Sequence, residues 1–421
     1  MDADRTLKIY RMLEARFKDV IEKHRIHENS QQETVIEGLD GELYKTECGK
    51  RRRVFLNLPE LGKFIYDRDC TSVQVKRIVE KHDAKGIVEV VGKNNEYRIP
   101  HHEALRIAIE CGAKQRYIRK AGQKMQVWIV NTLKGGSGKT TTTAHLGVGL
   151  ATEGNHVYRV GLIDLDPQGN LTTLMYPEFD SESDFSVGDI VMNEFELDEG
   201  ESYQEFVSSC FKETNVPNVR ILPAKELDNL FNLRTKESQN SGNYYRALEP
   251  LLKAVEDQFD IILIDTPPNI NDIVIAAHYS ADSVIMPLRP AQNDRDGTYK
   301  YLRTFSKVYE SLVSYGHKGY DHIKVITVDG QTNSASDQEL KREIWYAAGT
   351  CMLPDFNHSE AVKKCAMKGK TVFEISESEY SMKFDGKTLY GTKESLRSAQ
   401  MNVRAIVTGL EASIQESWSL L

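Results

Sequence analysis

The residues best suited to chemistry form a short run at 134–142, Lys-Gly-Gly-Ser-Gly-Lys-Thr-Thr-Thr. A loop that wraps a polyphosphate brings its backbone N–H groups against phosphate oxygens, and glycine permits that approach because it lacks a Cβ. Lys139 adds a charge for the β- and γ-phosphates, and the Thr140 hydroxyl suits Mg²⁺. The alternative, a flexible Gly/Ser loop, is disfavoured because an apolar strand precedes the run and a helix of small residues follows it. The predicted nucleotide ligands within the loop and the start of its helix are Gly135, Gly136, Ser137, Gly138, Lys139, Thr140 and Thr141.

Three aspartates end apolar runs further along the chain. Asp164 and Asp166 lie two residues apart at the end of one run, so their side chains point to the same side of an extended chain. Asp265 ends another run. At the carboxyl edge of a parallel sheet these carboxylates would face a metal ion and the γ-phosphate. We predict Mg²⁺ ligands at Thr140, Asp164 and Asp265, with contacts to the glycine loop as an alternative role for Asp164. A plain Asp-Pro turn is the alternative for either Asp164 or Asp166 alone.

From residue 127 onward, apolar runs of strand length alternate with helical patterns, which is typical of a parallel sheet. The expected fold class is therefore α/β, a P-loop parallel sheet flanked by helices. The expected strands cover 127–130, 158–164, 260–265, 283–287 and 323–327.

Charge divides the chain into two unequal parts. The whole chain carries a net charge of −8, whereas residues 1–126 hold 26 basic and 20 acidic side chains. Within that part, residues 50–124 hold 18 basic and 9 acidic side chains. A basic module joined to an acidic remainder suits an anionic partner such as nucleic acid, and a solvated lysine-rich surface is the alternative.

Residues 54–100 predict a winged helix-turn-helix. Two helices, the second over 73–81 and capped by Thr71 or Ser72, precede two strands that would form the wing. Polar side chains on the outer face of the second helix suit the major groove of DNA. The predicted DNA contacts of this module are Ser72, Gln74, Lys76, Arg77 and Lys93.

These patterns divide the chain into three segments. Residues 1–45 contain an amphipathic helix over 4–25 and a polar linker, and the apolar stripe of that helix would pack on a partner subunit or on its own domain. Residues 46–125 would hold the DNA-binding module and a connecting helix over 101–124. Residues 126–421 would form the nucleotide-binding domain.

The glycine loop departs from the standard P-loop, because Leu133 stands where its first glycine belongs and Lys134 precedes the double glycine. This form, Lys-Gly-Gly-x-Gly-Lys-Thr, resembles the deviant Walker A, or MinD/ParA, branch of P-loop ATPases. The runs Asp164-Leu-Asp-Pro-Gln-Gly-Asn and Asp265-Thr-Pro-Pro also resemble motifs of that family, and the resemblance covers most of residues 127–400.

The resemblance implies ATP or ADP as the ligand, with Mg²⁺, and a homodimer that encloses ATP between its subunits. Lys134 would reach the nucleotide of the facing subunit, and Asp166 would orient the attacking water. Lys134, Lys139 and Asp166 are therefore the expected catalytic residues. Pro290 and Gln292 would lie near the adenine.

A second basic cluster lies in residues 360–404, which read as helical with exposed cations. The runs Glu360-Ala-Val and Lys370-Thr-Val-Phe-Glu resemble the segment with which family members bind DNA without sequence preference. Phosphate contacts need only well-placed Lys or Arg, and a solvated helix face is the alternative. The predicted contacts are Lys363, Lys364, Lys368, Lys370 and Arg397.

With its N-terminal module, the chain resembles the long, type Ia, ParA partition ATPases. That resemblance implies weak ATP hydrolysis stimulated by DNA and a ParB-type partner, an ATP dimer on nucleoid DNA, and repression of its own operon at a specific operator. Two other functions stay open: a nucleotide-sensing transcriptional repressor without a transport role, and a MinD-like positioning ATPase. The acidic segment 410–421 disfavours the latter, because membrane binding would need a basic amphipathic helix.

Composition favours a cytoplasmic protein without a membrane partner, and the resemblance implies that it associates with the nucleoid. The sequence has no apolar run of about 18 residues, and its first five residues lack the apolar core of a signal peptide. The six cysteines are scattered without a CxxC pair, so we expect free thiols rather than a zinc site.

Overall fold

The computed structural model describes residues 36–37, 43–44, 55–66, 71–83, 86–91, 96–230, 244–290, 304–328, 335–384, 387–388 and 390–419. The helix expected over 4–25 therefore lies outside the described residues, as do Lys93 and Gln292. Two short strands near the N-terminus, β1 Ile36–Glu37 and β2 Leu43–Tyr44, pair antiparallel.

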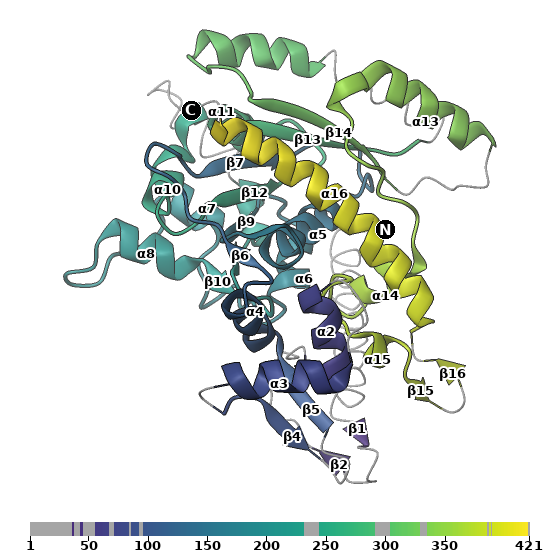
Figure 1. Ribbon diagram of the computed structural model, residues 1–421. Coiled ribbons are helices and arrows are strands. Elements are labelled where there is room, and N and C mark those ends of the chain that lie inside the picture. Colours follow the sequence, from purple (N-terminus) through teal and green to yellow (C-terminus); the bar gives the residue numbers. More distant parts are fainter. Residues whose placement is uncertain are drawn as a thin grey trace, which may run out of the picture.

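A seven-stranded sheet forms the centre of the fold, in the order β10-β11-β9-β12-β7-β13-β14 (Figure 1). Every neighbouring pair is parallel except β10 with β11. The sheet confirms the predicted α/β class and the five predicted strands, although the second begins at Val160 rather than at residue 158. The strands are β7 Gln126–Val130, β9 Val160–Asp164, β10 Lys212–Glu213, β11 Val219–Leu222, β12 Ile261–Asp265, β13 Ser283–Leu288 and β14 His322–Thr327.

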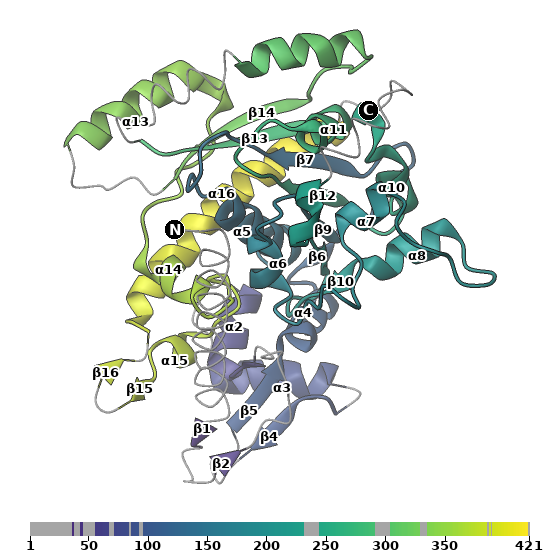
Figure 2. The same cartoon turned by 180° about the vertical axis from the view of Figure 1, so that it is seen from behind.

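Helices cover both faces of this sheet (Figures 1 and 2). They are α5 Lys139–Thr152, α6 Asn170–Met175, α7 Val187–Val191, α8 Tyr203–Cys210, α10 Glu249–Ala254, α11 Asp272–Ser280, α13 Ala335–Ala348, α14 Glu360–Ala366, α15 Glu377–Tyr380 and α16 Lys393–Ser419, with a further helix over 304–314. Short 3₁₀ turns lie at η1 Glu226–Leu230, η3 Tyr244–Arg246 and η4 Gly349–Cys351.

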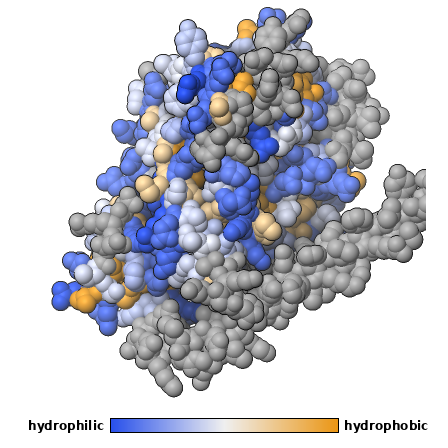
Figure 3. Space-filling model, turned by 90° about the vertical axis from the view of Figure 1, so that its right-hand side faces the viewer, coloured by the Kyte–Doolittle hydropathy of each residue, from blue (hydrophilic) through white to orange (hydrophobic). Residues whose placement is uncertain are grey.

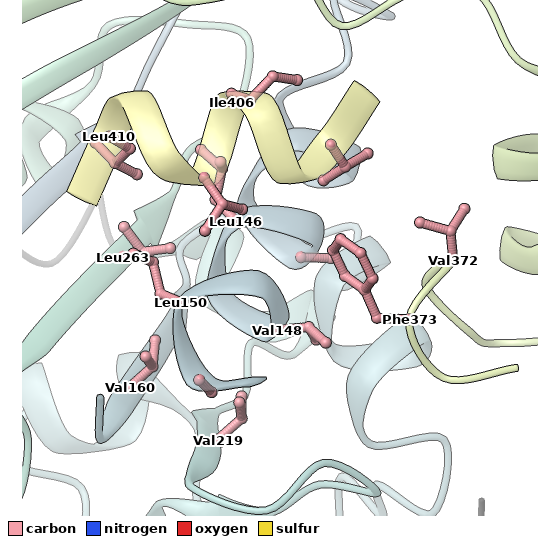
Figure 4. Close-up of a cluster of buried hydrophobic side chains, with 14 of the residues drawn as sticks. Leu146, Val148, Leu150, Val160, Val219, Leu263, Val372, Phe373, Ile406 and Leu410 are labelled. Carbon is pink, nitrogen blue, oxygen red and sulfur yellow. The ribbon is translucent and has the colours of Figure 1, made fainter. Parts of the chain in front are cut away.

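The central strands β7, β9, β12 and β13 are buried along their whole length, because successive side chains point to opposite faces and helices cover both faces. Trp128 and Val130 of β7 join one hydrophobic cluster with α5 and α16. Val127 and Ile129 of the same strand join the other cluster, with α7, α8, α10 and α11. Figure 4 shows the first cluster, in which side chains of α5, α16 and the strands meet.

Helix α5 lies between the sheet and α16 (Figures 1 and 2). Two glycines permit this close packing. A Cβ on Gly147 would lie 2.7 Å from Leu162 Cδ2 of β9, and a Cβ on Gly149 would lie 2.3 Å from Val407 Cγ2 of α16. Contact on two sides holds α5 firmly, and with it the loop that precedes the helix.

Residues 55–110 form a smaller unit with its own hydrophobic core. Leu61, Val75 and Ile99 are fully buried in it. Helices and strands stand where they were predicted, and Thr71 caps the second helix in a capping box. The identity of this unit as a DNA-binding winged helix stays a prediction. Its strands β3 Phe55–Leu56, β4 Glu89–Val91 and β5 Glu96–Pro100 form an antiparallel sheet in the order β3-β5-β4, with helices α2 Leu58–Tyr66, α3 Ser72–His82 and α4 His101–Glu110.

The connecting helix expected over 101–124 is wrong in length, because α4 ends at Glu110. Gly112 adopts a φ of +77°, a left-handed conformation that ends helices, and Ala113 N–H donates to Ala108 O at 2.9 Å. The chain then extends, and β6 Gln115–Arg116 pairs in parallel with β8 His156–Val157.

The helical pattern expected across 360–404 is interrupted. Helices α14 and α15 are short, and the strands β15 Lys383–Phe384 and β16 Lys387–Thr388 pair antiparallel before α16 begins. Figure 3 shows one face of the molecule, on which the described surface is mostly hydrophilic with scattered apolar side chains. Among the described residues, no helix is both long and apolar enough to cross a membrane.

Hydrogen bonds join the smaller unit to the C-terminal region. Glu377 of α15 accepts from Lys63 Nζ of α2 at 3.1 Å and from Arg397 Nη2 of α16 at 2.6 Å. The Ser378 hydroxyl donates to Glu60 of α2 at 2.8 Å. Helix α2 therefore docks on α15 through polar contacts.

Candidate nucleotide and magnesium site

The glycine loop follows β7 and ends where α5 begins, at the carboxyl edge of the parallel strands (Figure 1). Gly138 is the N-cap residue of α5 and has a φ of +82°. A Cβ at this position would lie 2.6 Å from Val328 Cγ1, just beyond β14. Both the backbone conformation and the available space therefore require glycine here.

The start of α5 offers hydrogen-bond donors to an anion. No side chain caps the helix at Gly138, so its first backbone N–H groups have no intrahelical or capping partner. The Ser137 hydroxyl is buried and has no hydrogen-bond partner among the described residues. Backbone donors, the positive end of a helix and a buried hydroxyl fit the oxygens of a phosphate chain.

The two lysines of the loop differ in burial. Lys139 is 6% exposed, and its Nζ donates to the Lys134 carbonyl oxygen at 3.3 Å. Burial lowers the pKa of Lys139, and the charges of Asp265 and Asp166 oppose that shift. Lys134 has an exposed side chain, as a contact with a nucleotide in a facing subunit requires.

A hydroxyl and a carboxylate meet at the end of β12. Thr140 Oγ1 donates to Asp265 Oδ2 at 2.6 Å, and Thr143 Oγ1 lies 3.4 Å from Asp265 Oδ1. Asp265 is fully buried, and burial raises its pKa, whereas the Thr140 hydrogen bond and the Lys139 charge lower it. Oxygen donors of this kind suit Mg²⁺, so Thr140 and Asp265 fit the predicted metal site.

Asp164 instead binds its own chain. Its Oδ1 accepts from Asp166 N–H at 3.0 Å, and its Oδ2 accepts from Thr172 N–H at 2.9 Å and from the Thr172 hydroxyl at 2.8 Å. Burial raises the pKa of Asp164, and the nearby Asp265 charge raises it further. These three hydrogen bonds of Asp164 position the turn that carries Asp166. Both carboxylate oxygens of Asp164 thus already accept hydrogen bonds, and its metal-ligand role stays a prediction.

Asp166 lies in a tight turn after β9. Its Oδ1 accepts from Gln168 N–H at 3.1 Å, and its carbonyl oxygen accepts from Gly169 N–H at 2.8 Å. The side chain is 9% exposed and close enough to Lys139 and Asp265 to influence the pKa of each. The structure thus brings Asp166 to the loop lysine, where a water beside the γ-phosphate would lie.

The adenine contacts stay a prediction. Pro290 is buried just beyond β13, and Gln292 lies outside the described residues. Next to Pro290, Arg289 approaches Gly136 of the loop, since its Nη1 lies 4.0 Å from the position of a Cβ on that glycine. Sequence reasoning gave Arg289 no role, although a cation directly after a predicted strand beside a P-loop was a usable signal.

A second residue without a predicted role links α5 to the C-terminal region. His145 Nδ1 lies 2.8 Å from Thr141 O, and its Nε2 accepts from Val372 N–H at 3.3 Å. These partners define a neutral imidazole with its proton on Nδ1, and burial lowers the His145 pKa to about 4. The sequence carried no signal for this bond, because its two ends lie far apart in the chain.

The predicted DNA contacts on α3 lie at the surface. Ser72, Gln74, Lys76 and Arg77 are all exposed. Gln74 Oε1 also accepts from the Thr71 hydroxyl at 3.0 Å, so the helix cap uses part of its hydrogen-bonding capacity. The other three side chains satisfy the exposure that a groove contact needs.

Lys370 contradicts the expectation of an exposed cation. It is 3% exposed, and its Nζ lies 3.1 Å from Glu379 Oε1. Arg397 is paired with Glu377. The sequence gives the number of these cations, but only the tertiary structure decides which acids pack beside them.

The remaining C-terminal cations are more accessible. Lys363 and Lys364 are exposed, and Lys368 is partly exposed. Lys363 pairs with Glu360 at 3.2 Å within α14, and Lys364 Nζ donates to Tyr390 O at 2.5 Å. These three lysines keep the predicted DNA-contact role as a hypothesis.

A strand, a glycine loop with a buried lysine and a helix whose first threonine meets a strand-ending aspartate define a P-loop nucleotide-binding protein. A family profile described as an AAA domain matches residues 125–315. The chromosome partitioning protein ParA of Caulobacter vibrioides is 30% identical over 219 residues, which cover 52% of this chain and 74% of that protein. The chain belongs to the ParA family, within the MinD/ParA superfamily.

Two further comparisons define the extent of the likeness. A putative replication protein A of Sinorhizobium fredii is 32% identical over 206 residues, which cover 47% of this chain and 48% of that protein. The chain thus spans about half the length of that relative. A solved structure of a partition protein matches with a TM-score of 0.64 at 17% identity and covers 99% of both chains, which shows a shared fold.

Proposed function

We propose that this protein is a DNA-partition ATPase that binds Mg-ATP, dimerises around it and hydrolyses it. The observation that carries the proposal is the loop geometry: Lys139 is buried beside the glycines, and the Thr140 hydroxyl lies 2.6 Å from Asp265. Thr140 and Asp265 would hold Mg²⁺, which neutralises charge on the β- and γ-phosphates when bound.

Hydrolysis would depend on two residues beyond the phosphate cradle. Asp166 would orient the attacking water, and its turn is held by the bond from its backbone N–H to Asp164. Lys134 would stabilise charge on the nucleotide of the facing subunit, which its exposure supports. A site completed across an interface explains why activity would be weak in the isolated subunit.

Two surfaces would contact DNA. Lys363, Lys364 and Lys368 would bind phosphates of nucleoid DNA without sequence preference in the ATP dimer. Helix α3 would read an operator, with ADP bound, and so repress the operon of the protein itself. The basic excess of residues 50–124 and the exposure of Lys76 and Arg77 support this second role.

A ParB-type partner would stimulate hydrolysis and release the dimer from DNA. Family membership and the printed name of the Caulobacter relative, a chromosome partitioning protein, support this proposal. The protein would then work in the cytoplasm, on the nucleoid.

The test is Mg-ATP turnover by the full chain with and without DNA. Lys134→Ala should retain ADP binding but lose ATP-dependent dimers and turnover, because only the contact across the interface is removed. Asp166→Ala should bind ATP, dimerise and stay on DNA. Lys318→Ala is the matched control, an exposed lysine at the opposite edge of the sheet. Normal turnover by Lys134→Ala would refute the role across the interface.

The two DNA surfaces separate in gel-shift binding to random DNA and to the promoter of the protein's own gene, with ADP and with ATP. Joint replacement of Lys76 and Arg77 by alanine should abolish promoter binding and spare random DNA. Equal loss of binding to promoter DNA and to random DNA would show that the two surfaces do not have separate roles. A wild-type protein that binds ATP and its promoter but never hydrolyses ATP with DNA would instead be a nucleotide-sensing repressor.

A further inference from the structure

The strand next to β7 carries a cation to the glycine loop. Strand β13 runs parallel to β7 with Ile285 opposite Val130, and Asn131 N–H donates to Ile285 O at 3.0 Å. β7 ends at this point, whereas β13 continues to Leu288. Arg289 therefore lies beside the glycine loop rather than beside the strand.

Two neighbouring strands supply the walls of the loop. Val328 N–H, beyond β14, donates to Leu288 O at 2.8 Å, and the Val328 side chain occupies the space where a Cβ on Gly138 would stand. Arg289 lies beside Gly136 at a greater distance, with Nη1 at 4.0 Å from a Cβ built there, which is ordinary van der Waals contact. One wall of the loop is thus apolar and the other is a guanidinium.

The sheet order shows which part of a nucleotide Arg289 would reach. Asp166 and Asp265 come from β9 and β12, which lie on one side of β7, and Arg289 comes from β13 on the other side. The carboxylates mark the end of the site that would hold Mg²⁺ and the γ-phosphate. Arg289 approaches from the opposite side, where the phosphates common to ATP and ADP would lie.

A guanidinium suits this position because it presents several N–H donors in one plane and binds phosphate oxygens with two of them. A phosphate oxygen that accepts from the backbone N–H of Gly136 would lie close to Arg289, because Nη1 is 4.0 Å from a Cβ built on that glycine. A rotation of the Arg289 side chain would then bring its guanidinium to that oxygen. The remaining donors allow Arg289 to keep its other interactions in the structure. The half-buried side chain would lose little freedom on binding.

We propose that Arg289 is a phosphate-binding residue that acts within its own subunit, on the phosphates shared by ATP and ADP. It complements Lys139 and differs from Lys134, whose expected target is the nucleotide of the facing subunit. This inference rests on the proposed function, because it requires that the loop bind an adenine nucleotide.

The experiment measures Mg-ATP and Mg-ADP affinity of the full chain by isothermal titration calorimetry. Arg289→Gln should weaken both nucleotides equally, by about tenfold to a hundredfold, since a charge-assisted hydrogen bond is lost. Arg289→Lys should fall between the wild type and Arg289→Gln, because it keeps the charge but not the planar fork. Arg220→Gln on β11 is the matched control, a partly exposed arginine bonded to Gln258 and far from the loop.

Circular dichroism shows whether each variant is folded. If Arg289→Gln does not fold, Arg289→Lys still tests the assignment. Unchanged affinity of a folded Arg289→Gln, beside a wild type that binds, would overturn the assignment. Loss of ATP affinity alone would also overturn it, because Arg289 would then act on the γ-phosphate. A wild type that binds neither nucleotide would instead overturn the proposed function itself.

Discussion

The glycine loop and the C-terminal basic region both bury a lysine, but they use it differently. Lys139 is 6% exposed and lies among uncapped helix donors and the buried Ser137 hydroxyl, which no described residue satisfies. Lys370 is 3% exposed and is already paired with Glu379. Burial by itself therefore does not identify a functional lysine. What distinguishes the loop is that the buried Ser137 hydroxyl and the first N–H groups of α5 find no acceptor among the described residues, so that an anionic ligand would complete them.

The largest effect is expected from Gly138→Ala. An alanine at this position would have to adopt a φ of +82°, and its Cβ would lie 2.6 Å from Val328 Cγ1. Because the loop would have to deform, Mg-ATP affinity should fall about a hundredfold or more. Calorimetric titration measures this. Gly200→Ala is the control, since Gly200 has a φ of +87° but no atom within 4 Å of a Cβ. That variant should bind nucleotide normally and lose about 1 kcal/mol of stability; equal affinity of the two variants would contradict the steric argument.

Acid should weaken the link between the loop helix and the C-terminal region. The pKa of His145 is about 4 in the folded chain against an ordinary 6.5, so only the unfolded chain takes up this proton as pH falls from 6.5 towards 4. The free energy of unfolding therefore falls by up to about 1.4 kcal/mol per pH unit as pH drops from 6.5 towards 4. Above pH 6.5 the stabilising contribution of the neutral His145 is fully present. Urea unfolding at pH 7, 6 and 5 should show a flatter pH dependence for His145→Gln than for the wild type, even if the variant is less stable at pH 7. Parallel curves would show that His145 does not titrate as a buried neutral group.

Lys370→Gln should destabilise the fold by about 1–2 kcal/mol, because it leaves Glu379 without its buried partner. It should leave the salt dependence of DNA binding unchanged, since Lys370 is not at the surface. Lys363→Gln is the matched variant: its pair with Glu360 is exposed and screened by solvent, so stability should change little, yet the salt slope of DNA binding should fall by about 1. The reverse pattern would place the DNA contact at Lys370 and refute the comparison of buried and exposed cations.

The smallest effect concerns the docking of the smaller unit. Glu377→Gln removes the carboxylate that Lys63 and Arg397 share. The loss of this negative charge beside two cations should raise affinity for random DNA about threefold at low salt, measured by fluorescence anisotropy. Glu360→Gln, which removes the partner of Lys363 and of His358 within the same segment, is the control and should change affinity less, since it affects one lysine rather than a lysine and an arginine. Unchanged or weaker binding by Glu377→Gln would show that these two cations lie away from the DNA path.

Local patterns were sufficient for much of this protein. The five strands, the start of α5 near Lys139 and a side-chain cap of α3 at Thr71 or Ser72 were predicted, because apolar runs, glycine freedom and side-chain caps act over a few residues. The structure places that cap at Thr71. The meeting of Thr140 with Asp265 was also predictable, since carboxyl ends of parallel strands share one edge of a sheet.

Other features were decided only by the tertiary structure. The bond from Val372 to His145, the burial of Lys370 and the approach of Arg289 to Gly136 each join or cover segments that are distant in the sequence. Composition reports how many cations a segment holds, but their environment depends on which acids and apolar side chains pack beside them. That packing depends on how the strands and helices are arranged in space. Neither the hydrophobic periodicity nor the spacing of motifs in the sequence predicts this arrangement.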